Sequence, residues 1–109
     1  MPAYAIAHLH SVRMGPDIVT YLERIDATLE PFGGRFIVHG GPKTVLEGDL
    51  PGDVIVIEFP DRAAAEAWYA SPAYREILPL RLDNAEGVAV IVDGVGPEHR
   101  ATDVLATAA

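Results

Sequence analysis

The chain has 109 residues, half of them hydrophobic, which suits a single domain with a real core. Sixteen acidic and eight basic residues give a formal net charge of -8, so a nucleic-acid backbone or an anionic membrane surface would be repelled. There is no cysteine, which excludes disulfides, thiolate nucleophiles and zinc–thiolate sites and fits a cytoplasmic protein.

Neither a signal peptide nor a membrane helix is expected. The first ten residues, MPAYAIAHLH, lack the basic start and the long apolar run of a signal peptide. No apolar stretch approaches the roughly 20 residues that a membrane helix needs.

The first part of the chain predicts a strand followed by a helix. Residues 4–10, YAIAHLH, favour a strand, and the helix lies within residues 15–32. Its apolar positions recur at helical spacing and are Ile18, Tyr21, Leu22, Ile25 and Leu29. Pro16 favours a helix start and Gly33 with Gly34 a helix end.

Two further strands follow. Residues 35–40, RFIVHG, predict one strand with an irregular continuation through residues 44–48. Residues 53–59, DVIVIEF, predict the other and are rich in β-branched side chains.

The last part predicts two helical pieces, a strand and a tail. Asp61 is a natural N-cap for the first piece, and Ser71 caps the second, with Pro72 at its first position. Residues 87–94, GVAVIVDG, form the last strand, so the domain is expected to span residues 1–94. The small, polar tail at residues 95–109 has the composition of a flexible end.

The order βαββαβ predicts an α+β, ferredoxin-like sandwich, in which two helices cover one face of a four-stranded antiparallel sheet. The other face should then be polar. The sequence does not show this. Val54 and Val56 face one side of the sheet and Ile55 and Ile57 face the other, and the last strand is also apolar on both faces. Two apolar faces predict a homodimer, with a second copy covering the free face.

Four segments of the chain carry a family resemblance: PFGGRFIVHGG, VLEGDLPGDVIVIEFP, AAAEAWYASPAYREILPLR and VIVDG, which together span about residues 4–94. They resemble the family known as domain of unknown function 1330, in the dimeric α+β barrel superfamily. The resemblance implies the same dimeric fold and no particular reaction. His39 stands where this family is expected to carry a basic residue, often arginine.

The wider superfamily is similar in fold to small cofactor-free monooxygenases, muconolactone-type isomerases and polyketide cyclases. In those proteins a small organic ligand lies between the sheet and the helices. By analogy of fold, the resemblance implies a ligand cleft in the same place.

Arg81 is the first candidate for substrate binding. Tyr74, Ile77, Leu78 and Arg81 follow helical spacing, so Arg81 falls on an apolar stripe if Pro79 does not end the helix. A guanidinium there either forms a structural ion pair or anchors an anionic substrate, since arginine binds carboxylates in a bidentate manner.

The aromatic and hydroxyl residues before Arg81 have the same two interpretations. Trp68 is expected in the core. Tyr69 and Tyr74 carry hydroxyls that need partners when buried, and beside Ser71 they could bind a polar substrate group. Ser71 has a simpler role as an N-cap, and no nucleophile elbow surrounds it.

His39 and Glu58 are the candidate catalytic residues, as groups that could move a proton. Glu58 interrupts an apolar strand, so it would act as a general base or else pair with Arg35, Arg62 or Arg81. Glu47, expected at the mouth of the sandwich, and Arg35, from the family-like run, are further candidates for substrate binding.

A metal or an organic cofactor is not expected. His8 and His10 share one face of the first strand, where Glu58 could complete a metal site, but such spacing is common. No phosphate-binding loop, dinucleotide fingerprint, zinc signature or haem motif is present.

Two functions remain open at this stage. The first is a cofactor-free enzyme, an isomerase, cyclase or monooxygenase, that holds a small polar or anionic molecule between sheet and helices. The second is a non-catalytic binding or structural dimer, in which the run from Trp68 to Arg81 braces the helix against the sheet.

Overall fold

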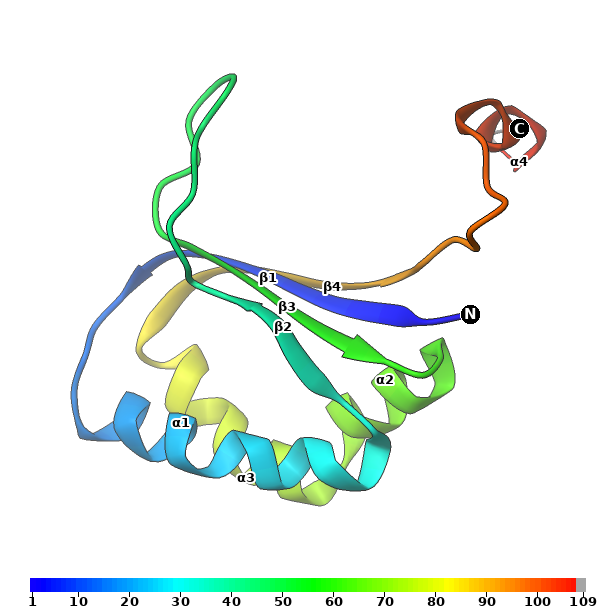
Figure 1. The fold of residues 1–109 in the computed structure, drawn as a ribbon. Helices are drawn as coiled ribbons and strands as arrows, with labels where there is room; N and C mark the ends of the chain where they lie inside the picture. Colours follow the sequence, from blue (N-terminus) through cyan, green and yellow to red (C-terminus); the bar gives the residue numbers. More distant parts are fainter. Residues whose placement is uncertain (108–109) are drawn as a thin grey trace.

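The computed structural model describes residues 1–107, and its centre is a four-stranded antiparallel sheet with helices on one face (Figure 1). The strands are β1 (Ala3–Val12), β2 (Arg35–His39), β3 (Asp53–Phe59) and β4 (Ala85–Asp93). Their spatial order is β2-β3-β1-β4, which is the ferredoxin-like arrangement that the sequence predicts.

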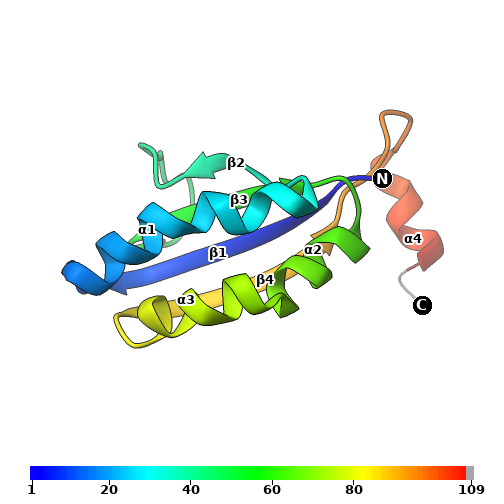
Figure 2. The ribbon, with the colours of Figure 1, turned by 90° about the horizontal axis from the view of Figure 1, so that it is seen from below.

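The helices lie in two rows beneath the sheet, as Figure 2 shows. One row is α1 (Pro16–Leu29), which ends in the 3-10 turn η1 (Glu30–Phe32), and the other is α2 (Arg62–Ala70) continued by α3 (Pro72–Leu82). Within the described residues, no helix has the length and apolar character needed to cross a bilayer.

The predicted caps of the second row are confirmed. The Asp61 carboxylate accepts a hydrogen bond from the Ala64 amide at 2.8 Å, and the Ser71 hydroxyl accepts one from the Tyr74 amide at 3.3 Å. Pro79 does not end α3, which continues to Leu82, so Arg81 stays on the helical stripe that the sequence predicts.

The turn from α1 into β2 depends on two glycines. Gly33 has a φ of 69°, in the left-handed region that favours glycine. A Cβ atom at Gly34 would lie 2.7 Å from the Phe59 ring, so only glycine fits there. The two residues let the chain turn tightly against the core.

The expected strand continuation at residues 44–48 is wrong. These residues belong to a long loop between β2 and β3 that rises from the sheet on the side away from the helices (Figure 1). The loop leaves β2 at Gly40, whose φ is 65°, and the sheet order places no further strand beside β2. An apolar segment without a neighbouring strand has no ladder to join.

The described part of the tail, residues 95–107, contains two short helical elements. It carries a 3-10 turn, η2 (Ala101–Asp103), and a short helix, α4 (Val104–Thr107), which also rise on the side away from the main helices (Figure 1). The last two residues of the predicted tail, 108–109, lie outside the described residues.

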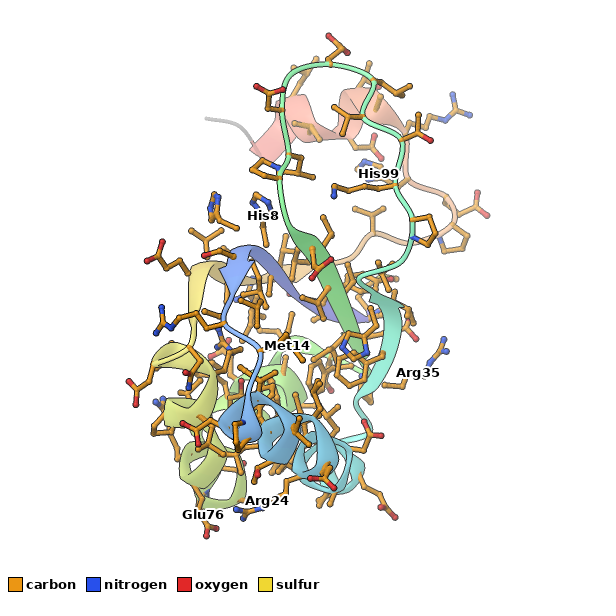
Figure 3. The ribbon with its side chains drawn as sticks, turned by 90° about the vertical axis from the view of Figure 1, so that its left-hand side faces the viewer. His8, Met14, Arg24, Arg35, Glu76 and His99 are labelled. Carbon is orange, nitrogen blue, oxygen red and sulfur yellow. The ribbon has the colours of Figure 1, made fainter. Side chains whose placement is uncertain are left out.

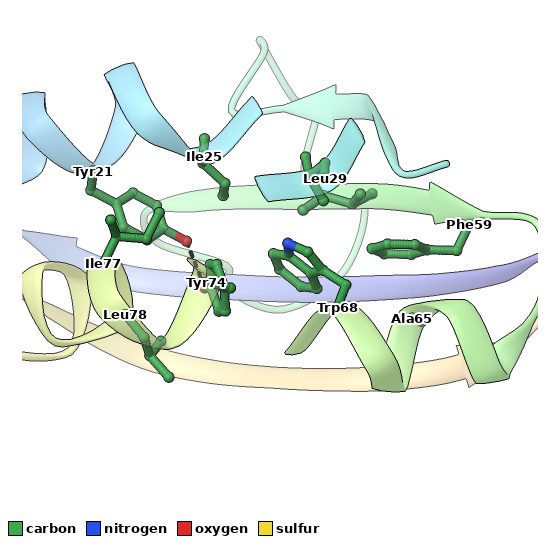
Figure 4. Packing of buried hydrophobic residues seen from close by; sticks show 10 residues of the cluster. Tyr21, Ile25, Leu29, Phe59, Ala65, Trp68, Tyr74, Ile77 and Leu78 are labelled. Carbon is green, nitrogen blue, oxygen red and sulfur yellow. Dashed lines mark hydrogen bonds between the residues drawn. The ribbon is translucent and has the colours of Figure 1, made fainter. Parts of the chain in front are cut away.

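The core lies between the sheet and the helices. Figure 4 shows Phe59, Trp68 and Leu29 packed against one another, and each is at most 3 % exposed. The indole N–H of Trp68 donates to the Thr28 hydroxyl at 3.0 Å. The prediction that Trp68 is a core residue is therefore confirmed.

The free face of the sheet is apolar, as the strand pattern predicts. Val88 and Val90 on β4 are 59 % and 54 % exposed, and Leu46 in the neighbouring loop is 88 % exposed. Exposed apolar patches of this kind are typical of interaction surfaces.

Candidate functional site

A cavity of about 700 Å³ lies between the sheet and the helices α1, α2 and α3. Its floor is made by small side chains that face the helices, Ala5 and Ala7 from β1 and Ala89 from β4, with Ala7 and Ala89 directly paired. Ala89 remains exposed although it faces the helices, which shows that no side chain packs fully onto this part of the sheet. Alanine at these positions therefore leaves space that a larger residue would fill.

Two tyrosines from different helices meet at this cavity. The hydroxyls of Tyr21 on α1 and Tyr74 on α3 are 2.7 Å apart, as the dashed line in Figure 4 shows. Both residues are buried and both line the cavity. One hydroxyl donates to the other, so the pair retains one hydroxyl hydrogen that is not used in this bond.

The guanidinium of Arg81 faces both hydroxyls and also lines the cavity. Burial lowers the pKa of Arg81, but the phenols of Tyr74 and Tyr21 outweigh it and raise the pKa overall. The side chain therefore stays charged. The sequence led us to expect either a structural ion pair or an anionic substrate at Arg81, whereas its partners in the structure are two phenols.

Within residues 1–107, Arg81 forms no ion pair with a carboxylate. The other arginine at the cavity, Arg62, is exposed and pairs with both Glu66 and Asp93. A half-buried cation without an anionic partner is a suitable site for an anionic ligand, because desolvation of the charge is then offset by the ligand.

Tyr21 is held neutral by its surroundings. Burial raises the pKa of Tyr21 far above its ordinary value, and Tyr74 raises it further, while Arg81 opposes the shift. The phenol pair therefore supplies hydrogen bonds rather than charge to the cavity.

His39 and Tyr69 also line the cavity, as the substrate-site hypothesis requires. The His39 ring stacks on Phe36, with ring centroids 4.3 Å apart and planes 12° from parallel. Tyr69 packs against Tyr74 at 5.6 Å, and its ring carries the Arg75 guanidinium at 4.8 Å.

Glu58 and Arg35 are not part of this cavity. Glu58 is paired with Tyr4 and Arg35 across the sheet and faces the opposite side from Ile57 and Phe59. There it forms an ion pair with Arg35 at 2.9 Å, on the outer side of β2 in Figure 3. The alternative that Glu58 pairs with Arg35 is therefore confirmed, and the expectation that Glu58 acts as a general base in this cavity is wrong, because strand residues alternate between faces.

Ser71 and Glu47 are also placed away from the cavity. The Ser71 hydroxyl donates to the Trp68 carbonyl at 2.7 Å while it caps α3, so both of its hydrogen-bonding roles serve the helix junction. Glu47 lies in the loop that projects away from the helices and is exposed, rather than at the mouth of the sandwich.

The histidine pair on β1 does not meet Glu58. The rings of His8 and His10 are 4.3 Å apart, and Nε2 of His8 hydrogen-bonds with the Pro51 carbonyl at 2.6 Å. Glu58 is paired with Tyr4, four residues from His8 along the strand. Among the residues described, no group of three side chains is arranged to hold a metal ion.

Sequence reasoning missed Tyr21 and the alanine floor. Tyr21 falls on the apolar stripe of α1, where its ring packs as a core residue would. The signal available was its hydroxyl, because a buried phenol needs a hydrogen-bond partner. The alanine floor could have been predicted from Ala5 and Ala7, which alternate in YAIAHLH and leave space on one face of the strand.

Solved structures share the fold at low sequence identity. Methylated RPA0582 protein is 19% identical with a TM-score of 0.68, covering 90% of this chain and 84% of that one. Another structure of RPA0582, from Rhodopseudomonas palustris, is 20% identical with a TM-score of 0.65, and the match covers 88% of this chain and 84% of that one.

Two more distant structures add to the comparison. A dimeric ferredoxin-like protein from Jannaschia sp. CCS1 is 12% identical, with a TM-score of 0.60 and coverage of 86% of this chain and 100% of that one. SnoaB, a cofactor-independent oxygenase from Streptomyces nogalater, is 11% identical, with a TM-score of 0.53 and coverage of 91% and 96%. At these identities the likeness shows the fold alone.

No curated protein matches the chain. The model of a protein family matches residues 2–95, which is most of the chain. This region includes all four strands and the three helices that enclose the cavity. The chain therefore belongs to the family described as Domain of unknown function (DUF1330).

Proposed function

We propose that this protein binds a small anionic organic molecule in the cavity between sheet and helices, with Arg81 as the anchor. The observation that carries the proposal is a charged, half-buried guanidinium that faces two phenols and has no carboxylate partner within the described residues. An anionic oxygen could accept hydrogen bonds from the guanidinium and from the free hydroxyl hydrogen of the Tyr21–Tyr74 pair.

The same arrangement would suit a cofactor-free enzyme of the isomerase, cyclase or monooxygenase type. His39 lines the cavity, where its imidazole could act as a general base, while Arg81 and the phenol pair would stabilise a developing oxyanion. SnoaB, a cofactor-independent oxygenase, shares the fold. Turnover goes beyond binding and would have to be measured separately.

The alternative is a structural brace, in which Arg81 only ties α3 to α1 through the two phenols. The cavity favours binding, because a brace has no need of an open alanine floor beside the cation. If Arg81 were only a brace, side chains would be expected to fill the space around it, as they do around the buried Trp68 in the same layer.

Arg81→Lys tests the anchor, with Arg24→Lys as the matched control. Arg24 pairs with Glu76 on the outer side of the helices, away from the sheet (Figure 3). We expect Arg81→Lys to weaken binding of small carboxylates, measured by calorimetry, by about tenfold or more, roughly 1.4 kcal/mol, because lysine lacks the planar fork. Arg24→Lys should leave binding unchanged.

The brace makes a different prediction for the same variants. If Arg81→Lys lowers the melting temperature markedly but leaves carboxylate binding at the wild-type level, the anchor role is wrong and the brace stands. If neither the wild-type protein nor the Arg24→Lys control binds any carboxylate, the proposed function fails.

We also propose that the protein acts as a homodimer in which the free sheet faces pack together. The apolar face is flanked by the loop from Gly40 to Gly52 and by the tail, both of which rise on that side and could clasp a second copy (Figure 1). A dimeric relative of the same fold supports this arrangement. A cytoplasmic location remains a prediction from the sequence.

A further inference from the structure

We infer that the molecule held in this cavity is a flat aromatic compound with a single anionic oxygen group. The inference rests on the proposed function, because it takes Arg81 as the anchor for the anion. It adds the chemistry of the rest of the ligand, which the floor and walls of the cavity define.

The floor suits a planar ring. Ala5, Ala7 and Ala89 present only methyl groups on two neighbouring strands. They form an apolar depression beside the larger side chains of Ile55 and Ile91, which share this face and also line the cavity. A planar ring system can bring one whole face into contact with such a surface. A puckered, saturated ring of the same carbon skeleton would touch it at fewer points, and dispersion attraction depends on close contact.

The wall above the floor is aromatic. Tyr74 stands at the centre, with ring centroids at 4.1 Å from Trp68, 5.6 Å from Tyr69 and 6.1 Å from Tyr21. All four residues line the cavity. Tyr21, Trp68 and Tyr74 are each at most 8 % exposed, so the half-buried Tyr69 is the ring of this cluster that can contact a ligand. Its ring attracts another aromatic ring through offset or edge-to-face contacts, which a saturated ring cannot make in the same way.

On the other side of the cavity, Phe36 and His39 form a stacked pair that also lines it. Aromatic rings therefore bound the space both beside the helices and beside β2. Branched aliphatic side chains such as Ile18, Leu22 and Ile25 line the cavity as well. The preference for a ring over an alkyl chain therefore rests on the accessible rings of Phe36, His39 and Tyr69.

The charges at the cavity favour one anionic group only. Arg81 is the arginine there without a carboxylate partner in the described part of the chain, since Arg62 pairs with Glu66 and Asp93. Asp53 and Glu66 also line the cavity. These carboxylates would repel a second anionic group placed away from Arg81.

Three matched probes separate these properties. They are 2-naphthoate, its saturated analogue decahydro-2-naphthoate, and the neutral 2-naphthamide, each titrated into the wild-type protein by calorimetry. We expect 2-naphthoate to bind at least tenfold more tightly than either of the others. The saturated acid is the more hydrophobic of the two acids, so apolar burial alone would not give this order.

Each other outcome overturns a definite statement. If both acids bind equally well and more tightly than the amide, the aromatic preference is wrong and the anion site stands. If the amide binds as tightly as 2-naphthoate, or if no probe binds, recognition of the anion fails and the proposed function fails with it.

Ala7→Leu locates the ring, with Ala67→Leu as the control. Ala7 is part of the floor, whereas Ala67 is an exposed residue of α2. We expect Ala7→Leu to weaken 2-naphthoate binding at least tenfold and Ala67→Leu to leave it unchanged. If Ala7→Leu does not fold by circular dichroism, Ala89→Leu takes its place, since Ala89 is exposed. Wild-type affinity in a folded floor variant would contradict the inference.

Discussion

Tyr21 shows how a single buried hydroxyl changes the character of a core position. Its ring packs with Ile25 and Leu29 as an apolar residue would, yet its hydroxyl is bonded to Tyr74 from another helix. This bond and the nearby Arg81 turn one part of the core into a polar wall. The site therefore begins with a residue that hydrophobic spacing alone places in the core.

The raised pKa of Tyr21 makes stability depend on pH in a defined direction. In the unfolded chain a tyrosine loses its proton near pH 10, whereas burial keeps Tyr21 protonated in the folded protein. The free energy of unfolding should therefore fall as pH rises above about 10, by at most about 1.4 kcal/mol per pH unit from this group.

Tyr21→Phe removes this proton and should make the decline shallower. Urea denaturation of both proteins at about pH 8, 10 and 11 measures the difference in slope. Equal slopes for the two proteins would show that Tyr21 does not keep its proton in the folded state.

The sequence predicted the placement of some candidate residues, because that placement follows from local spacing. Arg81 belongs to the apolar stripe of α3, and Trp68 lies in the core, as expected. Glu58 was considered as a residue of the cavity. It is an even-numbered strand residue like Val54 and Val56, and alternation along the strand places all three on the face away from the helices. The bond between Tyr21 and Tyr74 joins residues 53 positions apart, and spacing along one helix contains no information about it.

The junction between α2 and α3 is the element that positions Tyr74. Ser71 ends the first helix and caps the second, and its hydroxyl bonds both to the Trp68 carbonyl and to the Tyr74 amide. The Ser71 hydroxyl therefore links the backbone of Trp68, which precedes it, to the backbone of Tyr74, which follows it. The aromatic wall of the cavity depends on this junction.

Ser71→Ala should lower the free energy of unfolding by about 1–2 kcal/mol, because it removes a cap and leaves buried backbone groups without partners. Asp61→Ala is the control, since Asp61 caps α2 at an exposed position. Chemical denaturation should show the larger loss for Ser71→Ala. A larger loss for Asp61→Ala would contradict the role of the buried junction.

The elements that the sequence predicted well carry their own start and stop signals. Asp61, Ser71 and Pro72 define helix boundaries within a few residues of chain. The segment at residues 44–48 was misassigned because a strand also needs a neighbour, and the neighbour is a property of the whole sheet.

At the scale of the whole molecule, the exposed valines of the free sheet face predict self-association. Val88→Asp should convert the proposed dimer to a monomer, because a carboxylate would be buried in an apolar interface without a partner. Val19→Asp is the control, since Val19 is 48 % exposed on α1 and lies on the helical layer.

Light scattering at micromolar concentration gives the mass of each protein. We expect a dimer for the wild type and for Val19→Asp, and a monomer for Val88→Asp. A stable interface should bury at least about 1,000 Å² in total. A wild-type monomer would show that the apolar face has another role.

The central claim is that the cavity holds an anion at Arg81, and a crystal structure with bound 4-bromobenzoate tests it most directly. Anomalous scattering from bromine locates the ring independently of the carboxylate. We predict bromine over the floor of Ala7 and Ala89, with the carboxylate within about 3.2 Å of the Arg81 guanidinium. Bromine outside the cavity, or a carboxylate that does not contact Arg81, would contradict the account.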